Sequence, residues 1–67
     1  MVEIVVNGSA RRVSEDSTVL DLLGEMGVAP ERVAIELDRE ILKREHWSER
    51  RLHGGERLEV VHFVGGG

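Results

Sequence analysis

Residues 18–27 read TVLDLLGEMG and predict a short amphipathic helix. Its apolar positions recur at the i, i+3, i+4 and i+7 spacing of one helix face, at Val19, Leu22, Leu23 and Met26. Thr18 suits the N-cap, with Asp21 three residues later as an acidic form of the capping box, and Gly27 suits the left-handed position that ends a helix. About two to three turns of helix do not persist alone in water, so this helix must lie against another apolar surface.

A β-hairpin before the helix supplies that surface. Residues 2–6, VEIVV, are apolar and β-branched, as is typical of a strand. Asn7-Gly8 follows, and this pair readily adopts the positive φ angles of a tight hairpin turn. We expect the returning strand at residues 11–14, whose polar side chains suit the edge of a sheet.

Further strands are expected after the helix, at residues 33–37, 41–42 and 58–64. The first of these alternates apolar and polar residues, as a half-buried strand does. Turns are expected at residues 38–40 and at Gly54-Gly55. The segment 43–53 is predicted to be irregular, with a helical turn near residues 48–51.

The order of these elements is hairpin, helix, strand, short strand and strand. A helix placed between a hairpin and later strands buries its apolar stripe by lying across one face of the sheet. We therefore predict an α+β fold of the β-grasp type, with a mixed sheet of about four to five strands and one main helix. With 67 residues the chain is one domain. We assign residues 1–64 to the β-grasp domain and residues 65–67 to a flexible C-terminal glycine tail.

The composition argues against several classes of function. The formal net charge of −4 repels phosphate backbones, so nucleic-acid binding is not expected. The chain has no cysteine, which excludes disulfides, thiolate metal sites and a nucleophilic thiol. Because the N-terminal residues lack a basic leader and no apolar run approaches the ~20 residues of a membrane helix, we expect a cytoplasmic protein without membrane contact.

No pattern of catalytic residues is evident in the sequence. The histidines are spread over the last third of the chain without the spacing of a metal motif, at His46, His53 and His62. The serines lack a nucleophile-elbow or triad context, and there is no phosphate-binding loop. We therefore expect no catalytic residue, no metal and no bound cofactor, and we expect that the chain is not an enzyme.

The chain ends in three glycines, Gly65, Gly66 and Gly67. Such a run is also found at frayed ends and cloning scars. A glycine backbone, however, threads a narrow channel that any side chain would block. Once a terminal carboxylate is joined to AMP, it becomes an electrophile that a sulfur nucleophile attacks, which leaves a thiocarboxylate. We therefore interpret the Gly67 carboxylate as the reactive group, with Gly65 and Gly66 as the segment that enters a partner.

The last strand predicts a docking face beside this tail. If Leu58 and Val60 face the helix, the opposite face carries Glu59 and the two large apolar residues Val61 and Phe63. The same open face is expected to include Val5, Ala34 and Glu36. Single exposed apolar residues are common, but a cluster beside a reactive terminus is better explained as a partner surface. Trp47 is interpreted instead as closing one end of a small core.

The chain resembles the ThiS family, the sulfur carriers of thiamine biosynthesis, over essentially its whole length. The ordered motifs that carry the resemblance are Asn7-Gly8, Thr18-Val19 with Leu22-Leu23, Val33-Ala34-Ile35 with Leu37-Asp38, Ile41-Leu42, Arg44-Glu45 with Trp47, Gly54-Gly55-Glu56-Arg57-Leu58-Glu59, and the terminal glycines. The family's terminal Gly-Gly corresponds to Gly66 and Gly67. Gly65 is an additional glycine, and trimming of one residue would move the working carboxylate to Gly66.

The resemblance implies a ubiquitin-like β-grasp fold and three partner enzymes. An E1-like adenylating enzyme (ThiF-type) would use ATP to adenylate the C-terminal glycine, and a cysteine desulfurase would be the indirect source of sulfur. The thiocarboxylate would then pass its sulfur to a thiazole synthase (ThiG-type). Two alternatives stay open at this point: a sulfur-carrier subunit of the molybdopterin-synthase type, and a non-covalent ubiquitin-like interaction module in which the tail is passive.

Overall fold

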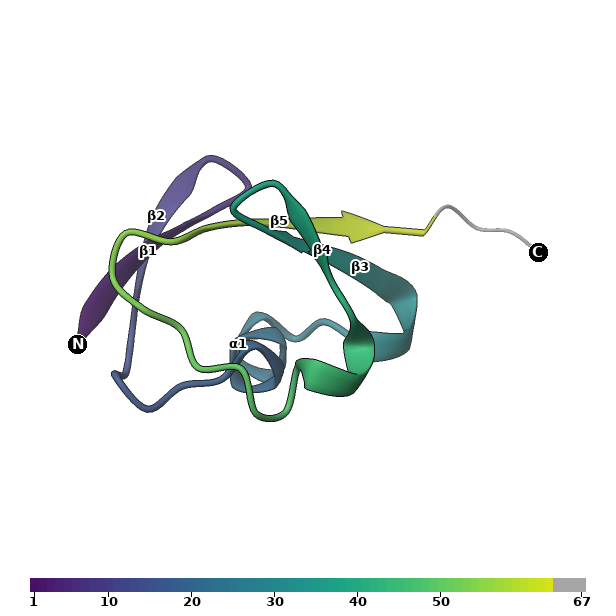
Figure 1. Ribbon diagram of the computed structural model, residues 1–67, viewed down its shortest axis with the longest axis horizontal. Helices are drawn as coiled ribbons and strands as arrows, with labels where there is room; N and C mark the ends of the chain where they lie inside the picture. Colours follow the sequence, from purple (N-terminus) through teal and green to yellow (C-terminus); the bar gives the residue numbers. More distant parts are fainter. Residues whose placement is uncertain (64–67) are drawn as a thin grey trace.

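The computed structural model describes residues 1–63, which form a five-stranded mixed sheet and one α-helix (Figure 1). The elements are β1 Val2–Val6, β2 Ser9–Val13, α1 Val19–Met26, η1 Pro30–Arg32, β3 Val33–Leu37, β4 Glu40–Leu42, η2 Arg44–His46 and β5 Arg57–His62. The strand order is β2-β1-β5-β3-β4. Strands β1 and β5 are parallel, and the other neighbouring strands are antiparallel. The predicted α+β fold, a mixed sheet with one helix across one face, is confirmed.

Helix α1 begins and ends as its sequence predicts. The Thr18 hydroxyl accepts a hydrogen bond from the Asp21 amide at 3.1 Å, and the Asp21 carboxylate accepts one from the Thr18 amide at 3.0 Å. These reciprocal bonds satisfy two amides that the first helical turn leaves without an intrahelical partner. Gly27 ends the helix at φ 71°, in the left-handed region. None of the helices in residues 1–63 has the length and apolarity that crossing a membrane requires.

Each of two antiparallel strand pairs, β1–β2 and β3–β4, is joined by a tight two-residue turn. Asn7 and Gly8 have φ angles of 50° and 83°, as in the mirror-image turns whose twist matches paired strands. Because this turn uses only two residues, Val6 pairs with Ser9, and β2 covers Ser9–Val13. The predicted start of that strand at residue 11 and its end at residue 14 were therefore wrong. The turn between β3 and β4 repeats this geometry at Asp38 and Arg39, so β4 begins at Glu40, one residue earlier than expected.

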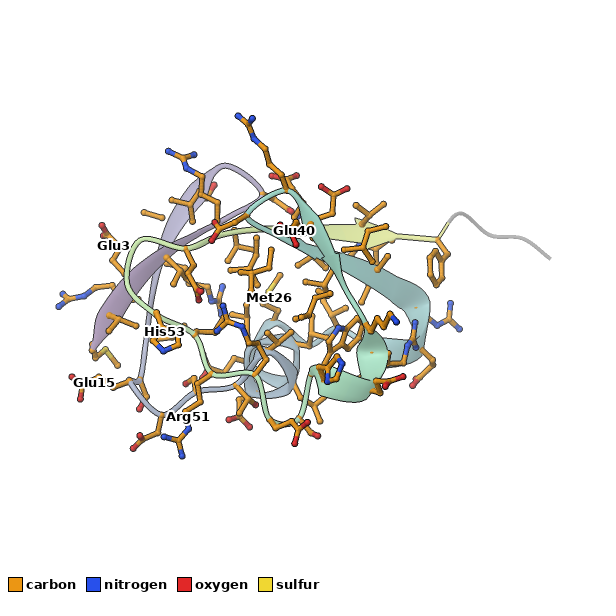
Figure 2. All side chains as sticks on the ribbon, in the orientation of Figure 1. Glu3, Glu15, Met26, Glu40, Arg51 and His53 are labelled. Carbon is orange, nitrogen blue, oxygen red and sulfur yellow. The ribbon has the colours of Figure 1, made fainter. Side chains whose placement is uncertain are left out.

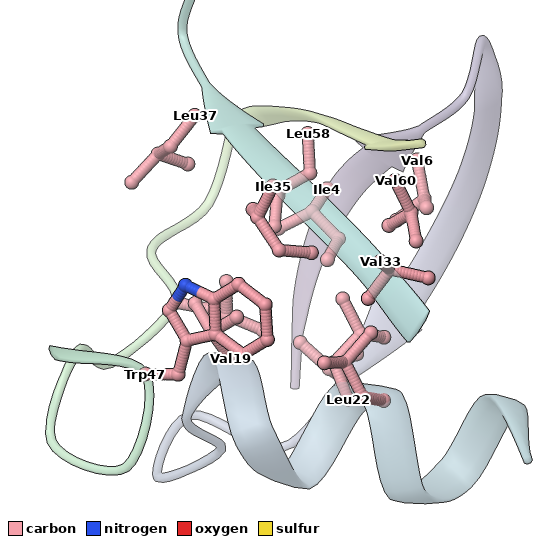
Figure 3. Packing of buried hydrophobic residues seen from close by; sticks show 13 residues of the cluster. Ile4, Val6, Val19, Leu22, Val33, Ile35, Leu37, Trp47, Leu58 and Val60 are labelled. Atoms are coloured by element: carbon pink, nitrogen blue, oxygen red, sulfur yellow. The ribbon is translucent and has the colours of Figure 1, made fainter. Parts of the chain in front are cut away.

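The core lies between one face of the sheet and α1 (Figure 3). Its fully buried members come from every layer of the fold and include Ile4, Val13, Val19, Leu22, Leu23, Val33, Ile35, Leu52 and Leu58. Val19, Leu22 and Leu23 are the predicted stripe of the helix, and Met26 packs partly buried at its end. Burial of this stripe stabilises a helix that is too short to persist alone.

The segment after β4 contains a helical turn that begins earlier than the sequence predicted. It starts with η2, Arg44–His46, and a hydrogen-bonded turn follows in which the Arg50 amide donates to the His46 carbonyl at 2.9 Å. Trp47 explains the difference because the core fixes this residue at the end of the turn: its side chain is 2 % exposed, and its indole N–H donates to the Leu42 carbonyl at 2.9 Å. The Trp47 amide donates to the Arg44 carbonyl at 3.0 Å, which closes the turn before the tryptophan. The structural role predicted for Trp47 is thus confirmed.

Candidate functional site

The glycine tail, Gly65, Gly66 and Gly67, lies outside the described residues, as does Val64, the predicted end of the last strand. The structure does describe the strand that leads to the tail. Strand β5 runs through the middle of the sheet, and its C-terminal end points away from the body of the fold (Figure 1). The strand itself is Arg57–His62, so it begins one residue earlier than predicted and ends before Phe63, which the prediction had included.

Strand β5 is held on both sides. On one side it pairs with β3 over five register positions, from Val33 opposite His62 to Leu37 opposite Leu58. Beyond the strand, the Phe63 amide still donates to the Arg32 carbonyl at 2.9 Å. On the other side, β1 contributes only two pairs, because it ends at the hairpin turn.

The side chain of Asn7 continues the pairing where β1 stops. Its amide oxygen accepts a hydrogen bond from the Val60 amide at 2.7 Å, and its amide nitrogen donates to the Val60 carbonyl at 3.3 Å. One side chain thus replaces the backbone partner that β1 would have provided. Sequence reasoning recognised Asn7 only as a turn residue. Nothing in the local pattern indicated a contact with a residue 53 positions later in the chain.

The open face of the sheet carries the residues that the sequence assigned to docking. Val61 and Phe63 are 50 % and 59 % exposed, whereas Leu58 and Val60 are buried on the opposite face. The antiparallel register places Ala34 opposite Val61 and Glu36 opposite Glu59, and the parallel register places Val5 opposite Arg57. Because directly opposed residues share a face of a sheet, Val5, Ala34, Glu36, Glu59 and Val61 lie on this surface, and the exposed Phe63 follows β5 beyond the last register pair. Their role in docking stays a prediction.

The sequence reasoning missed the most exposed large apolar residue of this surface. Ile41 lies opposite Glu36 in the β3–β4 register and is 78 % exposed, the highest value among the exposed large apolar residues of the described chain. It extends the open face by one strand beyond the predicted set. The signal that points to it is the two-residue turn at Asp38-Arg39, which fixes the register of β4 and therefore the face of Ile41.

The charges of the open face are not paired with one another. Among residues 1–63, no ion pair involves Glu36 or Glu59. The ion pairs of the described chain lie instead between β4 and β5, where Arg50 pairs with the largely buried Glu56, and His53 lies 3.7 Å from the same carboxylate. In Figure 2 the side chains on the outer side of the sheet project away from the helix.

The described residues contain no metal-binding arrangement of the kind that histidines and carboxylates form. No group of three or more His, Cys, Asp or Glu residues within residues 1–63 is placed to hold a metal ion. His46 lies near Glu45 and Glu49, at 4.0 and 3.8 Å, while His62 is on β5 and opposite Val33. The three histidines therefore belong to three different surroundings.

Comparison with known proteins identifies similar chains along almost the entire sequence. Residues 4–67 match the model of the ThiS family. The chain is 35 % identical over 63 residues to the sulfur carrier protein ThiS of Bacillus subtilis, covering 92 % of this chain and 96 % of that protein. The crystal structure of the thiamine biosynthesis protein (ThiS) of Geobacter metallireducens superposes with a TM-score of 0.83 at 35 % identity, covering 98 % of this chain and 100 % of the other.

A second group of relatives is much longer. The chain is 39 % identical over 66 residues to a thiazole synthase of Paramagnetospirillum magneticum and 35 % identical over 66 residues to one of Magnetococcus marinus. Each match covers 98 % of this chain and 20 % of the synthase, so the chain spans about a fifth of the length of these relatives.

Proposed function

The chain belongs to the ThiS family, and from this premise we propose that it is a sulfur carrier for thiamine biosynthesis. The observation that carries the proposal is the match of residues 4–67 to the family, which includes the three terminal glycines. The ubiquitin-like β-grasp fold agrees with this role because it presents one strand, β5, that leads directly to the tail.

The proposed chemistry takes place at the carboxylate of Gly67. A carboxylate oxygen attacks the α-phosphorus of ATP, pyrophosphate leaves, and an acyl adenylate is formed. Sulfide (HS⁻) then attacks the carbonyl carbon, the bond to AMP breaks and AMP leaves, and loss of the sulfur-bound proton gives the thiocarboxylate. The chain needs no catalytic side chain for these steps and acts as a co-substrate of its partners rather than as an enzyme.

The residues before Gly67 suit this chemistry. Gly65 and Gly66 have no side chains, so their backbone enters a channel too narrow for other residues. The end of the described chain is fixed to the sheet because the Phe63 amide donates to the Arg32 carbonyl and the Asn7 side chain bonds to Val60. An enzyme that binds the folded domain therefore also binds Phe63 at a defined position. The carboxylate of Gly67 is only four residues further along the chain.

The proposed partners are an adenylating enzyme of the ThiF type, a cysteine desulfurase as indirect sulfur source, and a thiazole synthase of the ThiG type as the recipient. The thiazole synthase is supported by the two long relatives, in which a segment similar to this chain is part of a protein of that name. We place the exchange in the cytoplasm, where ATP is available. The open face with Val5, Ala34, Glu36, Glu59, Val61 and Phe63 is the proposed docking face.

Intact mass measurement tests the proposed function. The 67-residue chain is incubated with ATP, a ThiF-type enzyme and a sulfur donor, and we expect a mass increase that corresponds to replacement of one oxygen by sulfur. A chain with one alanine appended after Gly67 should melt at the same temperature and gain no sulfur. Sulfur transfer to the appended chain, or full function of a chain without Gly66 and Gly67, would contradict the proposal and favour a passive interaction module.

A further inference from the structure

The basic residues of this chain are nearly all arginines. Of the nine, one is a lysine, Lys43, and the other eight are arginines. The difference matters for a chain whose carboxyl end is activated, because acyl adenylates react with amines to form amides. The arginine guanidinium stays protonated and does not attack, whereas a lysine amine attacks whenever it is deprotonated. Lys43 therefore carries the one side-chain amine of the sequence that an activated C-terminus can acylate.

Lys43 lies at the same end of the sheet as the C-terminal end of β5. It directly follows β4, and both β4 and β5 run antiparallel to β3, so the two strands end at the same edge. The next residue confirms this placement, because the Arg44 guanidinium donates to the Val33 carbonyl at 3.1 Å. Val33 is the first residue of β3 and lies opposite His62, the last residue of β5.

The distance from Phe63 to Lys43 is within the length of the C-terminal segment. Strand β3 lies between β4 and β5, so two strand spacings, about 10 Å, separate residues at the same level. Phe63 is about two residues further along the strand direction than Lys43, which makes the separation of their Cα atoms about 12 Å. Residues 64–67 span up to about 14 Å when fully extended. Their three glycines adopt the backbone angles of a chain reversal without strain, so the Gly67 carbonyl can reach the Lys43 amine of the same chain.

The Lys43 side chain is available for such a reaction. It is exposed, and none of the ion pairs among residues 1–63 involves it. The structural contribution of the residue comes from its backbone, since the Lys43 carbonyl accepts a hydrogen bond from the His46 amide at 2.9 Å at the start of η2. Modification or substitution of the side chain therefore leaves this contact in place.

The other amine of the 67-residue chain, the α-amino group of Met1, is out of reach. Strands β1 and β5 are parallel, with Val6 opposite Leu58. Met1 precedes this row by five residues and Phe63 follows it by five, which places them about 30 Å apart at the rise of a strand. Figure 1 shows the start of β1 and the end of β5 at opposite ends of the molecule. The segment after Phe63 covers only about half of this distance.

Building on the proposed function, we propose that Lys43 is a modification site for the chain's own C-terminus, and that its ε-amine captures the Gly67 acyl adenylate when no sulfide reaches it. The neutral amine attacks the carbonyl carbon and a C–N bond forms. The bond from this carbon to the AMP oxygen breaks, AMP leaves with the electron pair, and the nitrogen loses a proton to water. The product, here called the closed chain, has an isopeptide bond between Lys43 and Gly67 and has lost one water overall. Because it lacks a free carboxylate, it accepts neither AMP nor sulfur again.

Capture within one chain is faster than capture between chains. A short flexible connection gives two groups an effective concentration on the order of 1 mM, which is about a thousand times the amine concentration in a micromolar solution of the chain. His62 is nearer to the C-terminal segment than Lys43, but an acyl imidazole is hydrolysed by water and returns the free carboxylate. The lasting product is therefore a closed monomer rather than a dimer.

A 67-residue chain with Gly67 as a thioester tests the proposal without a partner enzyme. Thiol cleavage of an intein fusion yields this activated chain. At micromolar concentration we expect release of the thiol and formation of a monomer that is one water lighter than the free acid. The endoprotease Lys-C cuts after unmodified lysine, so it should divide the free acid at Lys43 and leave the closed chain uncut. Mass spectrometry of peptides from a second protease should find Lys43 joined to Gly67.

Two variants test whether the position of the lysine decides the outcome. Lys43→Arg keeps the charge and removes the amine, so its thioester should give only the hydrolysed acid. Lys43→Arg/Arg51→Lys keeps the amino-acid composition and moves the lysine to an exposed position near the opposite end of the molecule from the C-terminal end of β5 (Figure 2). We expect at least about ten-fold less closed monomer from this variant. Both variants should melt within a few degrees of the unaltered chain, since they exchange exposed cations. An equal yield of closed monomer from either variant would overturn the proposal.

The enzymatic reaction tests the same step on the adenylate. A ThiF-type enzyme that has first been shown to place sulfur on the unaltered chain is supplied with ATP but no sulfur donor. We expect the closed chain from the unaltered protein and none from Lys43→Arg. With the sulfur donor present, both proteins should gain sulfur to the same extent. Absence of the closed chain in this reaction would overturn the proposal even if the thioester closes, because the adenylate is the species that the proposal names.

The outcomes distinguish the proposal from the function on which it rests. If the chain gains sulfur but its thioester and its adenylate only hydrolyse, the modification of Lys43 is wrong and the carrier function stands. If no ThiF-type enzyme places sulfur on the unaltered chain, the carrier function fails, and the capture of an adenylate by Lys43 fails with it.

Discussion

The two faces of the sheet are built from the same strands but contribute differently to the protein. On β5, Leu58 is fully buried against the core and Val61 is 50 % exposed, although the two are only three residues apart. On β3, Ile35 is fully buried and its neighbours Ala34 and Glu36 lie on the open face. The strand alternation therefore separates the residues that hold the fold together from those that are available to a partner.

This separation has a physical reason in so small a domain. A chain of this size buries only about 60 % of the surface that its unfolded state exposes, so one face of the sheet and one stripe of the helix supply nearly all of the apolar burial. The open face contributes little, because its side chains are largely exposed or charged. Substitutions on the inner face should therefore act on stability, and substitutions on the open face should act on binding.

The largest expected effect is that of Leu22→Ala on the inner side. Leu22 is fully buried in the centre of the helix stripe, and its truncation removes apolar burial and leaves a cavity. We expect the free energy of unfolding to fall by about 3 kcal/mol, which is a third or more of the total for a domain of this size. Urea denaturation followed by circular dichroism measures this loss.

Leu20→Ala is the matched control for this prediction. It makes the same chemical change two residues earlier on the same helix, but Leu20 is 38 % exposed. We expect a loss below about 1 kcal/mol. Equal losses for the two leucines would mean that the helix does not present one face to the sheet.

The sequence was sufficient to predict those features that depend on near neighbours. The capping box at Thr18, the turn at Asn7-Gly8 and the alternation of β5 all follow from residues a few positions apart, and the structure has all three. The orientation of Val61 could be predicted for the same reason.

Other features depend on contacts between distant parts of the chain and could not be predicted. The face of Ile41 depends on the register of β4, which a turn with two positive φ angles at Asp38 and Arg39 determines. These are not residues that strongly indicate such a turn. The position of η2 depends on where Trp47 packs into the core. The contact of Asn7 with Val60 depends on how far β1 runs alongside β5.

A smaller effect on stability is expected at Asn7, which follows β1 and bonds through its side chain to the backbone of Val60 on β5. Asn7→Gly keeps the backbone free to adopt φ 50° but removes both hydrogen bonds to Val60. We expect the free energy of unfolding to fall by about 1–2 kcal/mol, since a hydrogen bond contributes about 1 kcal/mol. Amide hydrogen exchange should be faster at Val60 in particular, and Asn7→Ala should be less stable than Asn7→Gly because it adds backbone strain. Unchanged exchange at Val60 would show that β5 does not depend on this side chain.

The smallest effect on stability is expected at Phe63. Its substitution most directly tests whether exposed apolar residues act on binding rather than on stability. The ring is 59 % exposed, and the bond that holds the residue to β3 runs from its backbone amide to the Arg32 carbonyl, which Phe63→Ala leaves intact. We expect the free energy of unfolding to change by less than about 1 kcal/mol, while binding to an adenylating enzyme that activates the unaltered chain weakens about ten-fold. Leu20→Ala serves again as the control, because it removes an exposed apolar side chain on the helix. If Phe63→Ala instead destabilised the chain as much as Leu22→Ala, the open face would be part of the core, and a partner would not be needed to explain its apolar residues.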